Sequence, residues 1–135
     1  TGCCVLINSE IFNDIGYFDD RFFAYYEDVD FSIRLKAKGY YVAMMNDSYL
    51  QHFESASSKS SNQNEGNLSP NVHYLNIRNH ILLLKKHSKS FNTIGVLFYQ
   101  LIKILSYLIY FLIRFRFNKF KMVLKGFIDA INFKK

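Results

Sequence analysis

Tryptophan is absent from this 135-residue sequence, proline occurs once, and cysteine occurs only as the adjacent pair Cys3 and Cys4. Neighbouring side chains of an extended segment point to opposite faces, so these thiols are not expected to bind one metal ion together. We interpret them as small core residues of a protein in a reducing compartment. No nucleic-acid-binding motif is visible, and no signal peptide opens the chain. Because the sequence begins within apolar residues and without methionine, we expect an upstream segment to be missing.

Acidic residues are scarce in the second half of the chain, whereas aromatic residues are abundant. Fourteen Phe and ten Tyr indicate much half-buried surface, around a ligand or at a lipid boundary. Residues 1–58 carry nine acidic and four basic side chains (net −5), and residues 59–135 carry two acidic and thirteen basic ones (net +11). The acidic half suits a metal or proton-transfer site. The basic, Phe-rich half suits an anionic membrane surface more than nucleic acid.

Residues 22–30, FFAYYEDVD, place Glu27, Asp28 and Asp30 directly after an aromatic run. Aromatic walls lower the local dielectric and can raise a carboxyl pKa toward neutrality, which is the arrangement that a general base needs. The alternative is an acidic helix N-terminus, where the helix dipole and unpaired N–H groups favour Asp and Glu. This stretch alone leaves both interpretations open.

The first half predicts the order strand, helix, loop, helix, strand, which is typical of one side of a mixed α/β sheet. Residues 2–8 are apolar without alternation, as in a strand that is covered on both faces. A short helix should end at Ile15, before Gly16, and residues 28–38 should form a second helix. Residues 40–45 and 48–53 predict further strands. We therefore expect residues 1–53 to form one α/β part.

The second half is expected to be helical. Residues 54–70 are rich in Ser, Asn, Gln and Lys and predict a flexible lid or linker. Pro70 suits the first turn of a new helix, extending from about residue 71 to residue 87. We expect residues 71–92 to pack on the α/β part.

Residues 94–113 are a 20-residue apolar segment, long enough to span a bilayer. Its polar residues recur at steps of three and four, so they form one narrow seam on an apolar helix. They are Gln100, Lys103, Tyr107, Tyr110 and Arg114. A central Lys costs roughly 2.5–3.5 kcal/mol on insertion, while each large aliphatic or Phe residue returns about 0.3–0.6 kcal/mol. Spanning, in-plane binding and burial against protein therefore all remain open, and residues 93–135 are expected to be amphipathic membrane-associated or oligomerisation helices.

Residues 16–34 follow the pattern G-x-F-D-x-x-F-F-x-Y-x-E-D-x-D-x-x-x-R. Together with Gly39, His52 and the pair Arg78 and Asn79 after Tyr74, this run resembles the acceptor-side half of family 2 glycosyltransferases, close to rhamnosyltransferase-like members. The resemblance covers about residues 1–90. It implies the C-terminal part of a GT-A fold, a Rossmann-like mixed sheet. In that family a first half, which this sequence lacks, binds the nucleotide sugar and holds a divalent metal through a DxD-type motif.

The resemblance also implies roles for individual residues. Asp28 would be the general base that deprotonates the acceptor hydroxyl as it attacks the anomeric carbon, which inverts that centre. Glu27, Tyr25 and Tyr26 would bind the acceptor. Arg78 would contact the diphosphate of the donor.

His52 matches the position at which family members place a metal-bound His. The metal would be Mg²⁺ or Mn²⁺, held mostly by the missing half. The alternative is a strand-end His that is bonded to a neighbouring carbonyl. Many relatives have Pro where this chain has Met45 and Asn46, which concerns the shape of the loop and not the base.

The sequence thus predicts the C-terminal part of an inverting, metal-dependent transferase, inactive alone, that acts at the cytoplasmic face of a bacterial inner membrane. Its partners would be a nucleotide-sugar donor, a lipid-linked glycan acceptor and anionic lipid, with a homo-oligomer also open. The alternative is a non-catalytic membrane or oligomerisation module. A calcium loop is disfavoured, because the acidic run lacks the twelve-residue ligand rhythm and the central Gly.

Overall fold

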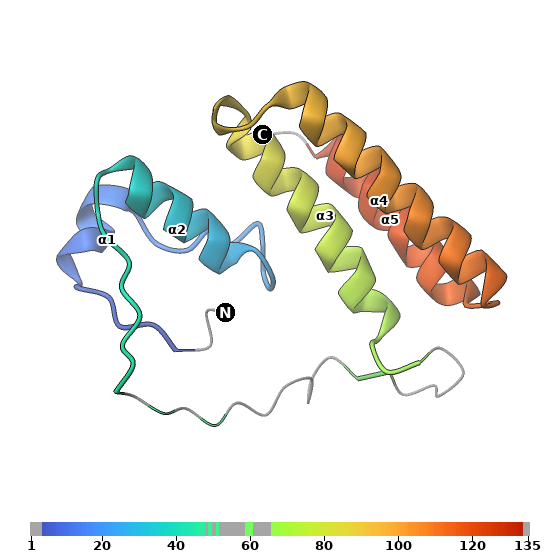
Figure 1. The fold of residues 1–135 in the computed structure, drawn as a ribbon, viewed down its shortest axis with the longest axis horizontal. Coiled ribbons are helices and arrows are strands. Elements are labelled where there is room, and N and C mark those ends of the chain that lie inside the picture. The colour runs from blue at the N-terminus through green and yellow to red at the C-terminus, as the bar shows by residue number, and fades with distance from the viewer. Residues whose placement is uncertain (1–3, 48, 50, 52–58, 61–65, 134–135) are drawn as a thin grey trace. The chain divides into compact units, whose positions relative to one another are not determined.

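The computed structural model describes residues 4–47, 49, 51, 59–60 and 66–133 of the chain. The chain divides into two compact units, Thr1–Glu54 and Ser55–Lys135, and each is described by itself. Figure 1 shows the helices of both units. They are α1 (Glu10–Ile15), α2 (Glu27–Ala37), α3 (Pro70–Lys86), the 3₁₀ turn Ser88–Ser90, α4 (Thr93–Ile113) and α5 (Phe117–Asn132).

The expected α/β fold, a GT-A-type mixed sheet, is wrong for the part of the chain that the structure describes. Its regular elements are helices, apart from an isolated antiparallel bridge between Lys59 and Leu68. Residues 5–8 and 40–45 carry strand-type sequence but form no ladder. A strand is stabilised by hydrogen bonds to a neighbour, and no described segment pairs with these two, so Leu6 and Tyr41 stay almost fully exposed. The third expected strand, residues 48–53, lies largely outside the described residues.

Aromatic contacts join α1 and α2 in the first unit. The ring of Phe12 in α1 stacks on Tyr17 at 4.8 Å and meets Phe31 of α2 at 5.7 Å. Phe18, in the connecting loop, stacks on the same Phe31 at 4.6 Å. Phe31 is buried, so its ring is the centre around which both helices and the loop are arranged.

Both helices of this unit end where glycine permits a left-handed backbone. Gly16 has φ 75° after α1, and Gly39 has φ 84° after α2. The end of α2 is also tied to α1, because Lys38 Nζ contacts Asp14 at 2.7 Å and the Tyr40 hydroxyl donates to the same carboxylate at 3.1 Å. The lysine hydrogen bond is the main cause that lowers the pKa of Asp14.

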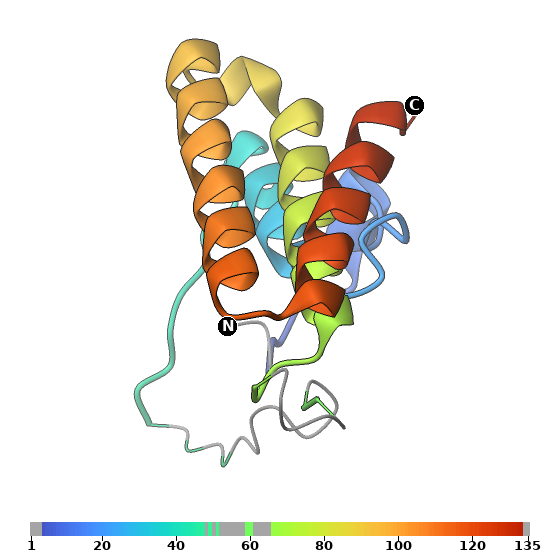
Figure 2. The same cartoon turned by 90° about the vertical axis from the view of Figure 1, so that its right-hand side faces the viewer.

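The second unit is an up-down-up arrangement of α3, α4 and α5, so that α3 and α5 run parallel (Figures 1 and 2). Its core residues come from all three helices: Ile77, Ile104, Phe111 and Val123. The helix starts follow local sequence, since Pro70 opens α3 and the side chain of Asn92 accepts the Gly95 N–H at 3.0 Å to cap α4. The helix expected from about residue 71 to residue 87 is therefore present as α3.

Gly126 sets the close approach of α5 to α3. A Cβ at this position would lie 2.7 Å from the Tyr74 carbonyl oxygen, which only a glycine avoids. The same two helices are also joined near their C-terminal ends by Lys85 Nζ, which donates to the carbonyls of Ala130 and Ile131 at 2.6 and 2.9 Å.

Candidate functional site

The aromatic loop, residues 17–26, leads into α2 and has an unusual backbone. Phe23, Tyr25 and Tyr26 have φ values of 57°, 68° and 74°, in the left-handed region that disfavours residues with a Cβ. Each such residue costs on the order of 1–3 kcal/mol and persists only where surrounding contacts impose it. The Ala24 N–H donates to the Phe22 carbonyl at 2.6 Å and closes a tight turn within the loop. Strain of this kind is concentrated at functional sites, so the loop is the first candidate in the molecule.

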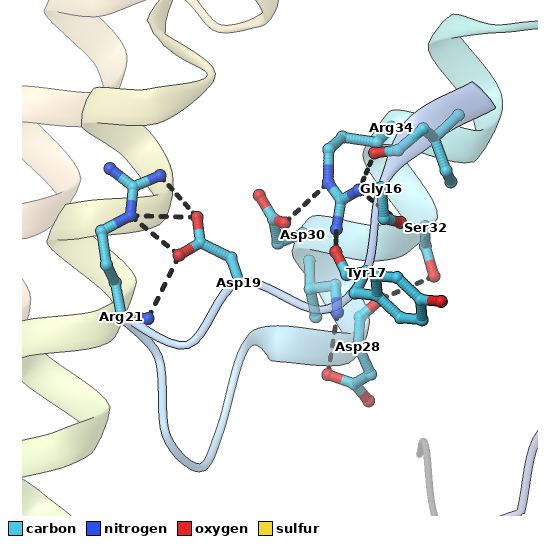
Figure 3. Close-up of polar contacts among 10 residues, drawn as sticks. Gly16, Tyr17, Asp19, Arg21, Asp28, Asp30, Ser32 and Arg34 are labelled. Atoms are coloured by element: carbon cyan, nitrogen blue, oxygen red, sulfur yellow. Dashed lines mark hydrogen bonds and ion pairs between the residues drawn. The ribbon is translucent and has the colours of Figure 1, made fainter. Parts of the chain in front are cut away.

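The loop delivers Glu27 and Asp28 to the first turn of α2, as the helical pattern of the sequence predicts. Asp28 Oδ1 accepts the Val29 N–H at 2.8 Å, and the Ser32 hydroxyl donates to the Asp28 carbonyl at 2.8 Å (Figure 3). Both acidic side chains are partly exposed. Glu27 Oε2 is buried and has no hydrogen-bond partner among the described residues. Both residues thus occupy the acidic helix N-terminus that the sequence also allows.

Asp30 has a structural position. It is fully buried, and its carboxylate accepts Arg34 Nε at 2.9 Å, one helical turn later. Arg34 also donates to three backbone carbonyls outside α2: to Ile15 at 2.5 Å, to Gly16 at 3.4 Å and to Tyr17 at 2.8 Å. Figure 3 shows the guanidinium between Asp30 and these carbonyls. The i,i+4 spacing predicts the ion pair, but nothing in the sequence indicates the three carbonyl contacts.

Asp19 caps the turn that opens the aromatic loop. Its carboxylate accepts the backbone N–H of Arg21 at 3.1 Å and the side chain of the same arginine at 2.5 Å (Figure 3). The side-chain hydrogen bond with Asp19 raises the pKa of Arg21 above its already high value. Asp19 is thereby committed to the fold of the loop.

Known proteins resemble this chain in sequence. The family model described as glycosyl transferase family group 2 matches residues 1–125. The chain belongs to this glycosyltransferase family. The O-antigen biosynthesis protein RfbC of Myxococcus xanthus is 40% identical over 57 residues, which is 42% of this chain and 4% of that protein. The chain thus matches only a small part of the length of this relative. No solved structure matches the chain.

Three further residues of this glycosyltransferase that carry the resemblance, Tyr74, Arg78 and Asn79, lie outside the aromatic loop. Arg78 lies in α3, in the second unit, where its Nη1 donates to Asn79 Oδ1 at 2.8 Å and its guanidinium lies 5.4 Å from the centre of the Phe133 ring. Tyr74, one turn earlier, donates its hydroxyl to Asp129 at 2.9 Å. The motif pair Arg78 and Asn79 is therefore a directly bonded pair.

His52 lies outside the described residues. Within the described part of the chain, no group of three His, Cys, Asp or Glu side chains could hold a metal ion. The resemblance assigns the metal mostly to the half that this sequence lacks, with His52 as its ligand in this chain.

The sequence patterns did not predict a polar cluster that lies between α3 and α4. His80 Nδ1 lies 2.8 Å from Gln100 Nε2 and 3.0 Å from Lys103 Nζ, so the polar seam of α4 meets α3 at this ring. Burial, assisted by the charge of Lys103, lowers the pKa of His80 to about 4. The neutral ring can then accept hydrogen bonds from Gln100 and Lys103. The repeat of Gln100 and Lys103 revealed the seam, but the partner on the neighbouring helix could not be read from it.

Proposed function

We propose that this chain is the acceptor-side part of an inverting glycosyltransferase that builds bacterial cell-surface polysaccharide. The observation that carries the proposal is the position of Glu27 and Asp28 at the start of α2, behind a strained aromatic loop, in a chain of this family. The similarity to RfbC, an O-antigen biosynthesis protein, supports a polysaccharide acceptor. The donor would be a nucleotide sugar and the acceptor a lipid-linked glycan.

In the proposed reaction, Asp28 removes the proton of the acceptor hydroxyl. The acceptor oxygen forms a bond to the anomeric carbon as the bond from that carbon to the nucleoside diphosphate breaks, and the leaving group departs with the electron pair. A positioned base is needed because a sugar hydroxyl is a poor nucleophile while it keeps its proton. The proposed base lies in the first turn of α2.

Glu27, Tyr25 and Tyr26 are proposed to bind the acceptor. The buried Oε2 of Glu27 has no partner among the described residues, so it is available to accept a hydrogen bond from an acceptor hydroxyl. The two tyrosines combine an aromatic face with a polar group, which suits a sugar ring. Arg78 is proposed as the contact to the donor diphosphate, and a metal site that includes His52 stays a prediction about residues outside the described part.

Replacement of Asp28 tests the role of the base. In the full-length protein, Asp28→Asn should lower kcat for sugar transfer by about 10²–10⁴-fold, because general-base catalysis contributes that much. Binding of the nucleotide sugar, measured by calorimetry, should change little. Asp20→Asn, an exposed acid of the same loop, is the matched control and should keep normal turnover. Near-normal turnover of Asp28→Asn would remove the base assignment.

A second proposal concerns α4, which we propose lies in the plane of an anionic membrane at the cytoplasmic face of the bacterial inner membrane. Of the helices in the described residues, α4 is the one that is long and apolar enough to cross a membrane, and only 17% of its most apolar window is buried. Three residues of its polar seam, Gln100, Lys103 and Tyr107, contact histidines of α3. Its other sides carry exposed apolar residues. These are Ile94, Leu97, Phe98, Leu101, Ile102, Leu105, Ile109, Leu112 and Ile113.

Charge selects anionic lipid over a second copy of the chain as the occupant of this face. Residues 59–135 have a net charge of +11, so two copies would repel each other. The same cations attract an anionic bilayer, at about 1 kcal/mol per Lys or Arg near the surface. An in-plane helix keeps Lys103 against His80, whereas a spanning helix would need this contact to lie within the hydrocarbon.

A further inference from the structure

Arg34 connects segments that are distant along the chain. Its guanidinium contacts the Asp30 carboxylate within α2, the Ile15 and Gly16 carbonyls at the end of α1, and the Tyr17 carbonyl at the start of the loop. The same group lies 5.1 Å from the centre of the Phe31 ring. A guanidinium has five donors in a fixed plane, so these contacts hold α1, the loop start and α2 in one relative orientation.

The pairing of Asp30 extends this network to the other end of the loop. The backbone N–H of Asp30 donates to the Tyr26 carbonyl at 2.9 Å, and Tyr26 directly precedes Glu27. Asp30 is fully buried, and its carboxylate is paired with Arg34 at 2.9 Å, while the charge of Arg21 also acts on it. Through Asp30, the guanidinium acts on the residue that leads into the acidic pair.

The backbone between these two anchored ends is strained. Phe23, Tyr25 and Tyr26 all have positive φ, and residues with a Cβ keep such values only where the surroundings impose them. Loss of the Arg34 contacts at either end would allow the loop backbone to change to less strained φ values. Such relaxation would move the side chains of Glu27 and Asp28, which follow directly.

We propose that Arg34 is a positioning residue, which holds the strained aromatic loop at both ends and thereby keeps Glu27 and Asp28 in their working geometry. The inference rests on the proposed function for its catalytic meaning, because it assigns to Arg34 an effect on the step that Asp28 performs. Arg34 itself contacts no reacting atom in this proposal.

Substitutions in the full-length protein test it. Arg34→Lys should lower kcat for transfer by about 10²-fold, since a small misplacement of reacting groups can have an effect of this size, while KM for the nucleotide sugar should stay within about twofold. The ammonium group of a lysine cannot reach Asp30 and the three carbonyls together. Lys36→Gln, an exposed cation of the same helix, is the matched control and should leave both constants unchanged.

Chemical rescue separates positioning from a general loss of fold. For Arg34→Ala, added guanidinium ion at millimolar concentration should restore part of kcat, whereas the activity of Lys36→Gln should not rise. An Arg34→Lys enzyme with kcat within twofold of the parent would overturn the inference. So would a loss of transfer that runs parallel to losses of donor binding and of helical circular dichroism.

Amide hydrogen exchange gives a readout that does not require turnover. In Arg34→Lys, the Ala24 and Asp30 amides, which bond to Phe22 and Tyr26 in the parent, should exchange at least tenfold faster, and amides within α4 should not change. Unchanged exchange at both amides overturns the inference, whatever Asp28→Asn does. Full turnover by Asp28→Asn removes the proposed base, whatever the exchange shows.

Discussion

Gly126 illustrates how one residue sets the distance between two helices. The neighbours of a Cβ at this position would be the backbone oxygen of Tyr74 at 2.7 Å and its Cα at 3.3 Å, and a helix backbone cannot move aside as a side chain can. Gly95 in α4 offers a contrast, because a Cβ there would meet the side chain of Asn92 at 3.6 Å, an ordinary contact. The two glycines differ in packing, not in being helical.

We therefore predict that Gly126→Ala destabilises the protein by about 1–2 kcal/mol. Overpacking costs roughly 1–3 kcal/mol, and the better helix propensity of alanine offsets up to about 1 kcal/mol of it. Gly95→Ala should be neutral or stabilising. Urea unfolding followed by circular dichroism would measure both, and equal midpoints for the two variants would contradict the packing argument.

At this scale, sequence patterns located the acidic pair and the ion pair but not the contacts that hold them. Glu27 and Asp28 do begin α2, and Asp30 does pair with Arg34, because both features depend on spacing within one helix. The bonds from Arg34 to the carbonyls of Ile15 and Tyr17 depend on the path of the chain between two helices. No residue-type preference predicts them.

At the scale of elements, two histidines of α3, His73 and His80, lie at the contact with α4. His80 faces Gln100, Lys103 and the ring of Tyr99. His73, two turns earlier in α3, packs edge-on against Phe111, and burial followed by the charges of Lys119 and Arg116 lowers its pKa to about 4. Both imidazoles are therefore expected to be neutral in the folded state at pH 6.

Because the pKa of each histidine is about 6.5 when unfolded and about 4 when folded, the unfolded chain binds more protons between these values. Stability should thus be complete above pH 6.5 and should fall as the pH drops toward 4. Urea midpoints at pH 7.5 and pH 5.0 would measure the loss. The double variant His73→Gln, His80→Gln should lose less stability over this interval than the parent does, and an equal loss in both proteins would refute the origin of the effect.

The helices were easier to predict than the remainder of the fold for a physical reason. Pro70, Gly16 and Gly39 act on the helix ends next to them, and each does so in the structure. A strand depends on partners that are distant in sequence, so β-type residues such as Leu6 and Tyr41 give no reliable signal alone. The prediction of a mixed sheet was wrong for this reason.

At the scale of the whole molecule, charge and apolar surface divide along the chain. The acidic residues are concentrated in the half that contains Glu27 and Asp28, whereas cations accompany α3, α4 and α5. This separation supports the proposal that Asp28 acts in the aqueous phase and that α4 binds lipid. The membrane proposal can therefore be tested separately from catalysis.

We predict that the full-length protein pellets with phosphatidylglycerol vesicles and much less with phosphatidylcholine vesicles. Raising the salt concentration from about 0.05 to about 0.5 M should release it, because exposed charges are screened over a few ångströms at the higher ionic strength. The double variant Leu101→Glu, Ile109→Glu removes two exposed apolar side chains from α4. Burial of each is worth about 1.5–3 kcal/mol, so vesicle affinity should fall at least tenfold. Met44→Glu, at an exposed site of the first unit, is the control and should bind as the parent does.

Equal binding to both lipids, or a double variant that binds normally, would contradict the assignment. A protein that self-associates without vesicles, and loses this association in the double variant, would identify the face as an interface between copies instead.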